Sequence, residues 1–174
     1  RRVLFRSFLD KSTIKFMTGG SAAKLISEYG FSVNDKYVSP NFDVQNGALK
    51  RSLRWLWKYY QYYNDCKKIS QKFIDDLVPE IIVSDEDFAS LTIAQEKKIP
   101  TILITDILET SFTSGIGSMI EKKMNQSMKK IIQKCDTVIM PETGEDQNNI
   151  RRVGPIVRQT DHRSEEHTSE LQSH

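Results

Sequence analysis

The run Glu80-Ile-Ile-Val-Ser-Asp-Glu-Asp-Phe-Ala-Ser-Leu91 decides the fold, because a short apolar segment ends on acidic residues and passes directly into a helical pattern. Similar apolar segments follow at residues 100–105 and 136–140. Helical patterns over residues 88–98 and 114–134 separate these segments. Strands joined by helices of about ten residues or more pair in parallel through right-handed crossovers. The sequence therefore predicts an α/β protein with a doubly wound, mostly parallel, Rossmann-like sheet.

The same alternation extends upstream of this run. A β-rich segment closes on a Gly-Gly turn, and the serine after the turn is in position to cap a helix. A glycine then ends that helix, and a second extended segment follows. The predicted elements are a strand over residues 13–18, a helix capped by Ser21 and ending at Gly30, an extended segment over residues 31–38, and a long helix over residues 48–77.

The two ends of the chain are related to each other as reverse complements. Residues 1–7 read RRVLFRS, and codons for them have a reverse complement that translates as RSEEHTS, the sequence of residues 163–169. The tail up to His174 also resembles a common sequencing-library adapter in translation. We therefore expect residues 1–7 and 163–174 to be adapter-derived rather than native, and the natural chain to be cut short at both ends.

Composition excludes several classes of function. The whole chain has a formal net charge of +2, and its expected adapter ends contain four arginines and three glutamates, which leaves about +1 for residues 8–162. This balance argues against a nucleic-acid partner. Cys66 and Cys135 lie far apart without a Cys-x-x-Cys spacing, so neither a disulfide framework nor a metal site is expected. The sequence has no apolar stretch of about 20 residues that would span a membrane.

Candidate binding residues lie where the predicted strands end. In parallel α/β sheets, ligands bind beyond the carboxyl ends of the strands. The Thr18-Gly19-Gly20 turn follows the first predicted strand and either lines a ligand or merely permits a tight turn. Asp85 and Asp106 follow two later strands, where a carboxylate either accepts hydrogen bonds from sugar hydroxyls or caps the next helix. We predict Asp87, directly before a helix, as such a cap.

Two segments have the composition of a membrane-contacting surface. Residues 50–63 combine cations with six aromatic rings, and residues 116–134 alternate apolar residues with lysines. Aromatic rings suit the headgroup region and cations suit anionic lipid. In the alternative interpretation, the rings pack against the sheet and the apolar stripe is ordinary core. The membrane-contact candidates are Arg54, Trp55, Trp57, Lys58, Lys122 and Lys123.

A family resemblance rests on short matches in the same order and spacing. Residues 80–91, Lys98-Ile-Pro-Thr-Ile-Leu-Ile104 and Val153-Gly-Pro-Ile-Val-Arg158 resemble nucleotide-sugar glycosyltransferases with the GT-B fold. The chain is similar to the lipid-linked N-acetylglucosaminyltransferase of peptidoglycan synthesis and to diacylglycerol glycosyltransferases. The match covers most of residues 8–158 and contains no single diagnostic catalytic motif. It implies the amino-terminal, acceptor-side half of a GT-B fold, with residues 159–162 starting the interdomain linker.

The resemblance also implies an activity for the parent protein. That protein would be a hexosyltransferase moving a sugar from a UDP-sugar to a lipid or glycan acceptor at the inner face of the plasma membrane. The first strand and its catalytic loop would precede Phe8, and the domain that binds the nucleotide sugar would follow Arg158. No cofactor is expected, the catalytic residues stay unknown, and the chain alone is expected to be inactive. The alternative is a non-catalytic acceptor-binding or membrane-anchoring subunit of a two-part glycosyltransferase.

Overall fold

The computed structural model describes residues 14–40, 44–45, 48–49, 52–111, 113 and 115–156. The segments predicted to be adapter-derived, the boundary at Phe8, Val157, Arg158 and the predicted linker all lie outside the described residues. The described residues form an α/β structure in which parallel strands alternate with helices. The predicted class is therefore confirmed.

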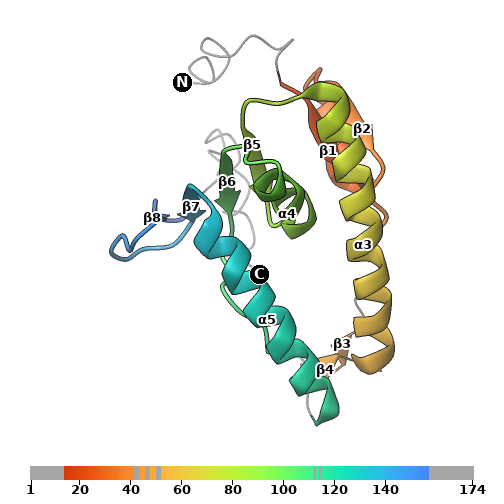
Figure 1. Cartoon of the computed structure of the whole chain (residues 1–174), viewed down its shortest axis with the longest axis vertical. Helices are drawn as coiled ribbons and strands as arrows, with labels where there is room; N and C mark the ends of the chain where they lie inside the picture. Colours follow the sequence, from red (N-terminus) through yellow and green to blue (C-terminus); the bar gives the residue numbers. More distant parts are fainter. Residues whose placement is uncertain are drawn as a thin grey trace, which may run out of the picture.

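A four-stranded parallel sheet forms the centre of the molecule (Figure 1). Its strands lie in the order β5, β6, β7, β8, and Ser84, Leu103 and Val138 are aligned side by side across the first three. Helices provide the crossovers between β5 and β6 and between β6 and β7, as the alternating pattern predicts. The elements are β5 (Ile82–Asp85), α4 (Phe88–Glu96), β6 (Thr101–Ile104), α5 (Ile116–Lys134), β7 (Thr137–Met140) and β8 (Ile150–Arg152).

A separate, smaller unit precedes this sheet. Strands β1 (Phe16–Thr18) and β2 (Val33–Asp35) pair in parallel around helix α2 (Gly20–Glu28), and their sheet is not hydrogen-bonded to the larger one. The resemblance implies a sheet that lacks its first strand, which would lie between the strands of residues 13–18 and 80–84, and no described strand pairs with the outer edges of β1 and β5. The prediction that Ser21 caps α2 is wrong, because the N-cap is Gly19, which has no side chain to cap with.

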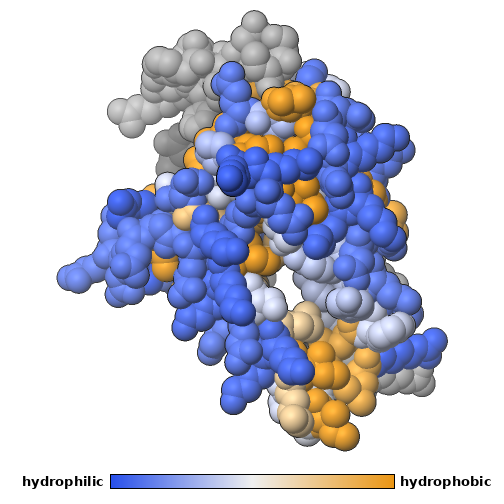
Figure 2. All heavy atoms as spheres, in the orientation of Figure 1, coloured by the Kyte–Doolittle hydropathy of each residue, from blue (hydrophilic) through white to orange (hydrophobic). Residues whose placement is uncertain are grey.

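The long helix α3 (Ser52–Leu77) packs along α4 (Figure 1). The predicted start at Ala48 is wrong, because β4 (Ala48–Leu49) pairs with β3 (Val44–Gln45) in an antiparallel ladder. Between the two helices, the Tyr63 hydroxyl lies 2.8 Å from Thr92 Oγ1. The first turns of α3 and α5 lie at the same end of the molecule, and Figure 2 shows exposed hydrophobic atoms at that end, where α5 begins.

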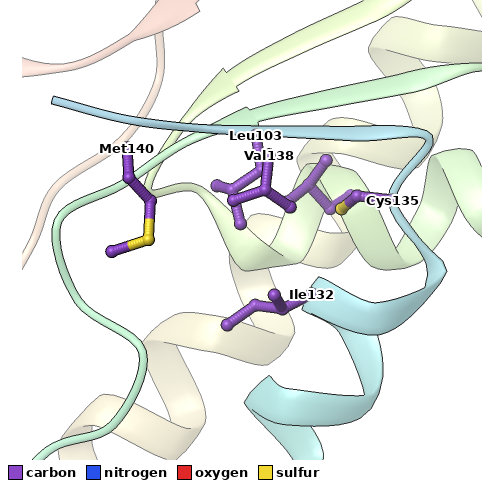
Figure 3. Packing of buried hydrophobic residues seen from close by; sticks show 6 residues of the cluster. Leu103, Ile132, Cys135, Val138 and Met140 are labelled. Atoms are coloured by element: carbon purple, nitrogen blue, oxygen red, sulfur yellow. The ribbon is translucent and has the colours of Figure 1, made fainter. Parts of the chain in front are cut away.

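The core lies between one face of the larger sheet and helices α4 and α5 (Figure 3). Alternate strand residues point to opposite faces, so Leu103, Val138 and Met140 all face the helices. Figure 3 shows Ile132 and Cys135 of the α5 end packed near them. The Asn149 side chain donates to the carbonyls of Ile132 and Cys135, at 2.9 and 2.7 Å, and so ties the strand β8 segment to the end of α5.

The completely buried Leu103 provides a test of this core. We expect Leu103→Ala to lower the free energy of unfolding by about 2–5 kcal/mol, because it removes buried methyl groups and leaves a cavity. Chemical denaturation of the full chain measures this loss. Ile116→Ala is the control, since the side chain is 72% exposed and surface substitutions change stability by about 0.5 kcal/mol or less. Equal losses in the two variants would contradict the packing described above.

Candidate functional site

The turn after β5 places three acidic side chains at the carboxyl edge of the sheet. Ser84 Oγ accepts a hydrogen bond from the Asp87 amide and donates one to the Asp87 carbonyl, both at 3.0 Å, which closes the turn. Within it, Glu86 has a φ of +57°, a left-handed backbone that is uncommon for residues other than glycine. Asp85 is exposed at the end of β5 and lies on the opposite sheet face from the buried Ser84.

Glu86 lies beside the end of the neighbouring strand. The Thr105 hydroxyl donates to Glu86 Oε1 at 3.1 Å, and the Glu86 amide donates to the Ile104 carbonyl at 3.2 Å. Burial raises the pKa of the Glu86 carboxyl, and the hydrogen bond to Asp106 and the Asp106 charge raise it further, whereas the Thr105 hydrogen bond lowers it. Glu86 and Asp106 thus form a carboxyl pair in which Glu86 holds its proton more strongly than an ordinary glutamate.

The predicted capping role of Asp87 is confirmed. Its Oδ1 accepts hydrogen bonds from the amides of Ala89 and Ser90, at 3.0 and 3.3 Å, and so satisfies two free donors at the start of α4. Its other carboxylate oxygen, Oδ2, accepts a hydrogen bond from the Tyr37 hydroxyl at 2.9 Å. One carboxylate therefore both caps the helix and contacts the loop after β2.

Tyr37 brings the Gly-Gly turn to the acidic edge. Its amide donates to the Thr18 carbonyl at 3.3 Å, and a Cβ built on Gly19 would lie only 1.8 Å from the Tyr37 carbonyl oxygen. Glycine is thus required at position 19 by close backbone approach. The Tyr37 hydroxyl also lies 2.6 Å from the oxygen of the buried Ser70 side chain. Burial, with the charge of Asp87, raises the pKa of Tyr37 far above its usual value of 10.0.

The structure places three of the predicted cleft residues in two groups at the strand ends, and adds Tyr37 to one group and Glu86 to the other. Thr18 and Gly19 contact Tyr37, and Asp106 lies beside Glu86. Gly20, with a φ of +60°, is exposed at the first position of α2. Neither Tyr37 nor Glu86 is among the residues predicted from the sequence. Glu86 stands inside the acidic cluster that carried the prediction, but a lone tyrosine in a loop gives no sequence signal. Among the described residues, no group of His, Cys, Asp or Glu side chains is arranged to hold a metal ion.

The membrane-contact candidates lie in the first two turns of α3 and α5, which begin at the same end of the molecule (Figure 1). Trp57 is 62% exposed there, and Ile116 and Met119 of α5 are 72% and 70% exposed. Trp55 is half-buried and stacks on Tyr59, with ring centroids 5.0 Å apart, so it belongs partly to the fold. The candidate cations are all exposed: Arg54, Lys58, Lys122 and Lys123.

Polar contacts hold the loop that leads into α5. The buried Glu121 carboxylate accepts hydrogen bonds from the amide and the hydroxyl of Thr113, at 3.0 and 2.6 Å. Asn125 likewise accepts from the Thr110 amide at 3.0 Å and donates to the Thr110 carbonyl at 2.8 Å. Hydrogen bonds to α5 therefore fix the loop that precedes the exposed apolar side chains at the start of this helix. None of the helices in the described part of the chain is long and apolar enough to cross a membrane.

Comparison with known proteins finds no family model that matches the chain, and no curated protein that matches it significantly.

The raised pKa of Glu86 predicts a pH dependence of stability. A folded-state pKa above the unfolded value means that the contribution of Glu86 to stability is present below pH 4.5 and is lost as the pH rises through the folded pKa. We therefore expect the free energy of unfolding of Glu86→Gln to increase relative to that of the wild type as the pH rises through the folded-state pKa of Glu86. Denaturant unfolding at a series of pH values measures the difference. Glu28→Gln, which removes one exposed carboxylate from α2, controls for net charge, and identical profiles for both variants would contradict the carboxyl pair.

Proposed function

We propose that this chain is the acceptor-side domain of a GT-B glycosyltransferase. The whole protein would transfer a sugar from a nucleoside-diphosphate donor, a UDP-sugar, to a lipid acceptor. The observation that carries the proposal is that Tyr37 links the Gly19 turn to Asp87, which follows Glu86 at the carboxyl end of β5. The carboxyl ends of parallel strands are the edge where α/β sheets bind ligands. The short sequence matches described above point to the same family.

The charge of this edge supports an acceptor site over a donor site. Asp85, Glu86 and Asp106 are carboxyl groups that suit sugar or glycerol hydroxyls, because they accept hydrogen bonds from them. A nucleoside diphosphate is itself anionic, and carboxylates a few ångströms away would repel it. The Gly19-Gly20 turn also lacks the lysine of a phosphate-binding loop. The donor would therefore bind to a different domain.

The separation of the two sheets also agrees with this placement. In the family that the chain resembles, the strands equivalent to β1 and β5 flank a central first strand. Here, β2 and β1 form one parallel sheet, β5 to β8 form another, and no described strand pairs with the edges between them. At their carboxyl ends, β1 and β5 are linked through Tyr37 and Asp87. One further strand between β1 and β5 would complete the order expected for this half of a GT-B fold.

The exposed apolar and cationic end fits a lipid acceptor. Trp57, Ile116 and Met119 would enter the headgroup region of the inner face of the plasma membrane, while Lys58 and Lys122 would lie near anionic headgroups. Association of this kind is peripheral and needs no membrane-spanning helix.

Ligand binding tests the acceptor assignment. We expect short-chain dihexanoylglycerol to shift the nuclear magnetic resonance signals of the Gly19 and Gly20 amides, because those amides lie at the proposed acceptor edge. UDP-N-acetylglucosamine should leave them unchanged, because the edge is acidic. A titration of the labelled full chain measures both. Shifts with the nucleotide sugar alone would contradict the assignment and would indicate a donor site instead.

Vesicle binding tests the membrane surface separately. We expect the chain to sediment with vesicles of phosphatidylcholine and phosphatidylglycerol, less so at high salt, because cations contribute to binding. Ile116→Glu should weaken binding by about ten-fold to a hundred-fold, since a buried side chain of this size is worth about 1.5–3 kcal/mol and about 1.4 kcal/mol is ten-fold. The matched control is Val78→Glu, which changes a 79% exposed residue just after the far end of α3. Equal loss in both variants would contradict a surface at the start of α5.

A further inference from the structure

Residues 14–40 fold into a small unit of their own. Strands β1 and β2 pair in parallel, helix α2 packs on them, and the rings of Phe16 and Phe31 meet edge to face with centroids 5.1 Å apart. The strands of this unit share no ladder with the larger sheet. Its position relative to that sheet must therefore be set by contacts other than strand pairing.

Tyr37 makes such contacts. Among the described residues, it forms both of the side-chain hydrogen bonds that join this unit to α3 and α4, to Ser70 and Asp87 respectively. Its ring also packs edge to face on Tyr62 of α3, with centroids 6.4 Å apart. The backbone of Tyr37, in contrast to its side chain, contacts Thr18 and Gly19 within the unit. A single residue thus links the body of the protein to the turn after β1.

Both partners of the Tyr37 hydroxyl are themselves held in place. Ser70 is completely buried within helix α3, so its hydroxyl is held by the packing of that helix. Asp87 is fixed by the amides that it caps at the start of α4. A hydroxyl between two fixed groups has little freedom, so it defines the position of the loop that carries it.

We propose that the Tyr37 hydroxyl is a latch that holds the unit of residues 14–40 against α3 and α4 and thereby sets the position of the Gly19 turn over the acidic edge. When both hydrogen bonds of the Tyr37 hydroxyl are formed, the Gly19 turn and the carboxyl end of β5 border the same site. With the latch open, residues 14–40 move as a unit while β5 to β8 keep their packing. This device does not depend on the identity of the ligand, so it stands whether or not the proposed transferase function is correct.

Hydrogen exchange of the full chain, followed by mass spectrometry, tests the latch. Tyr37→Phe keeps the ring and removes both hydrogen bonds, so exchange in peptides covering residues 14–36 should rise on the order of five-fold or more. Peptides from residues 82–104 should be unchanged. Tyr63→Phe is the matched control, because it removes a hydroxyl that links α3 to Thr92 of α4 without contacting the unit.

A second variant separates the latch from the cap. Asp87→Ser keeps a good N-cap for α4 but withdraws the carboxylate that accepts from Tyr37, so it should raise exchange in the same 14–36 peptides by a smaller factor. Three results would overturn the proposal: unchanged exchange of residues 14–36 in Tyr37→Phe, an equal rise in residues 82–104, or an equal effect of Tyr63→Phe on residues 14–36.

Discussion

Parallel strands cannot be joined by tight turns, and this constraint organises residues 82–140. The returns from β5 to β6 and from β6 to β7 each contain a helix, α4 and α5, and these helices bury the sheet face that carries Leu103 and Val138. At the start of β6, the Asp136 carboxylate accepts from the Thr101 amide at 2.8 Å and fixes the entry of the strand. Because the strands run in one direction, β5 and β6 also end at one edge. The acidic residues meet there as a consequence of the topology.

The sequence predicted the parts of the fold that have a strong local period. The buried strands around Leu103 and Val138 and the helices between them were placed within a few residues, because apolar runs and helical spacing are local signals. The start of α3 was misplaced, because Ala48 and Leu49 have good helix propensity, which their local antiparallel pairing with β3 overrides. Strand β8 was missed, because Ile150–Arg152 is short and charged.

The candidate site was predicted as a location and not as a set of contacts. The rule that ligands bind beyond strand ends pointed to Gly19, Asp85 and Asp106, and ligand binding by these residues stays a prediction. The contact between Tyr37 and Asp87 joins residues 50 positions apart, which no window of sequence reveals. The left-handed backbone of Glu86 and its carboxyl partner depend on the arrangement of two strands, so they too became visible only in the folded chain.

Helix α3 also sets a length scale between the two ends of the molecule. Trp57 and Ser70 lie on the same helix, and at 1.5 Å per residue they are about 20 Å apart along its axis. An acceptor that is anchored in a bilayer at the Trp57 end would need a headgroup or linker long enough to span that rise before reaching Tyr37.

The hydrogen-bonded set around Tyr37 also has an evolutionary consequence. Gly19 has no tolerated substitute, because even a methyl group would collide with the Tyr37 carbonyl oxygen. Tyr37 in turn needs Ser70 and Asp87, which stand 33 and 50 positions further along the chain. The four residues Gly19, Tyr37, Ser70 and Asp87 depend on one another through close packing and hydrogen bonds, so their spacing along the chain forms a signature. Distant relatives that have lost every other recognisable similarity should retain it, and a search for that signature can find them.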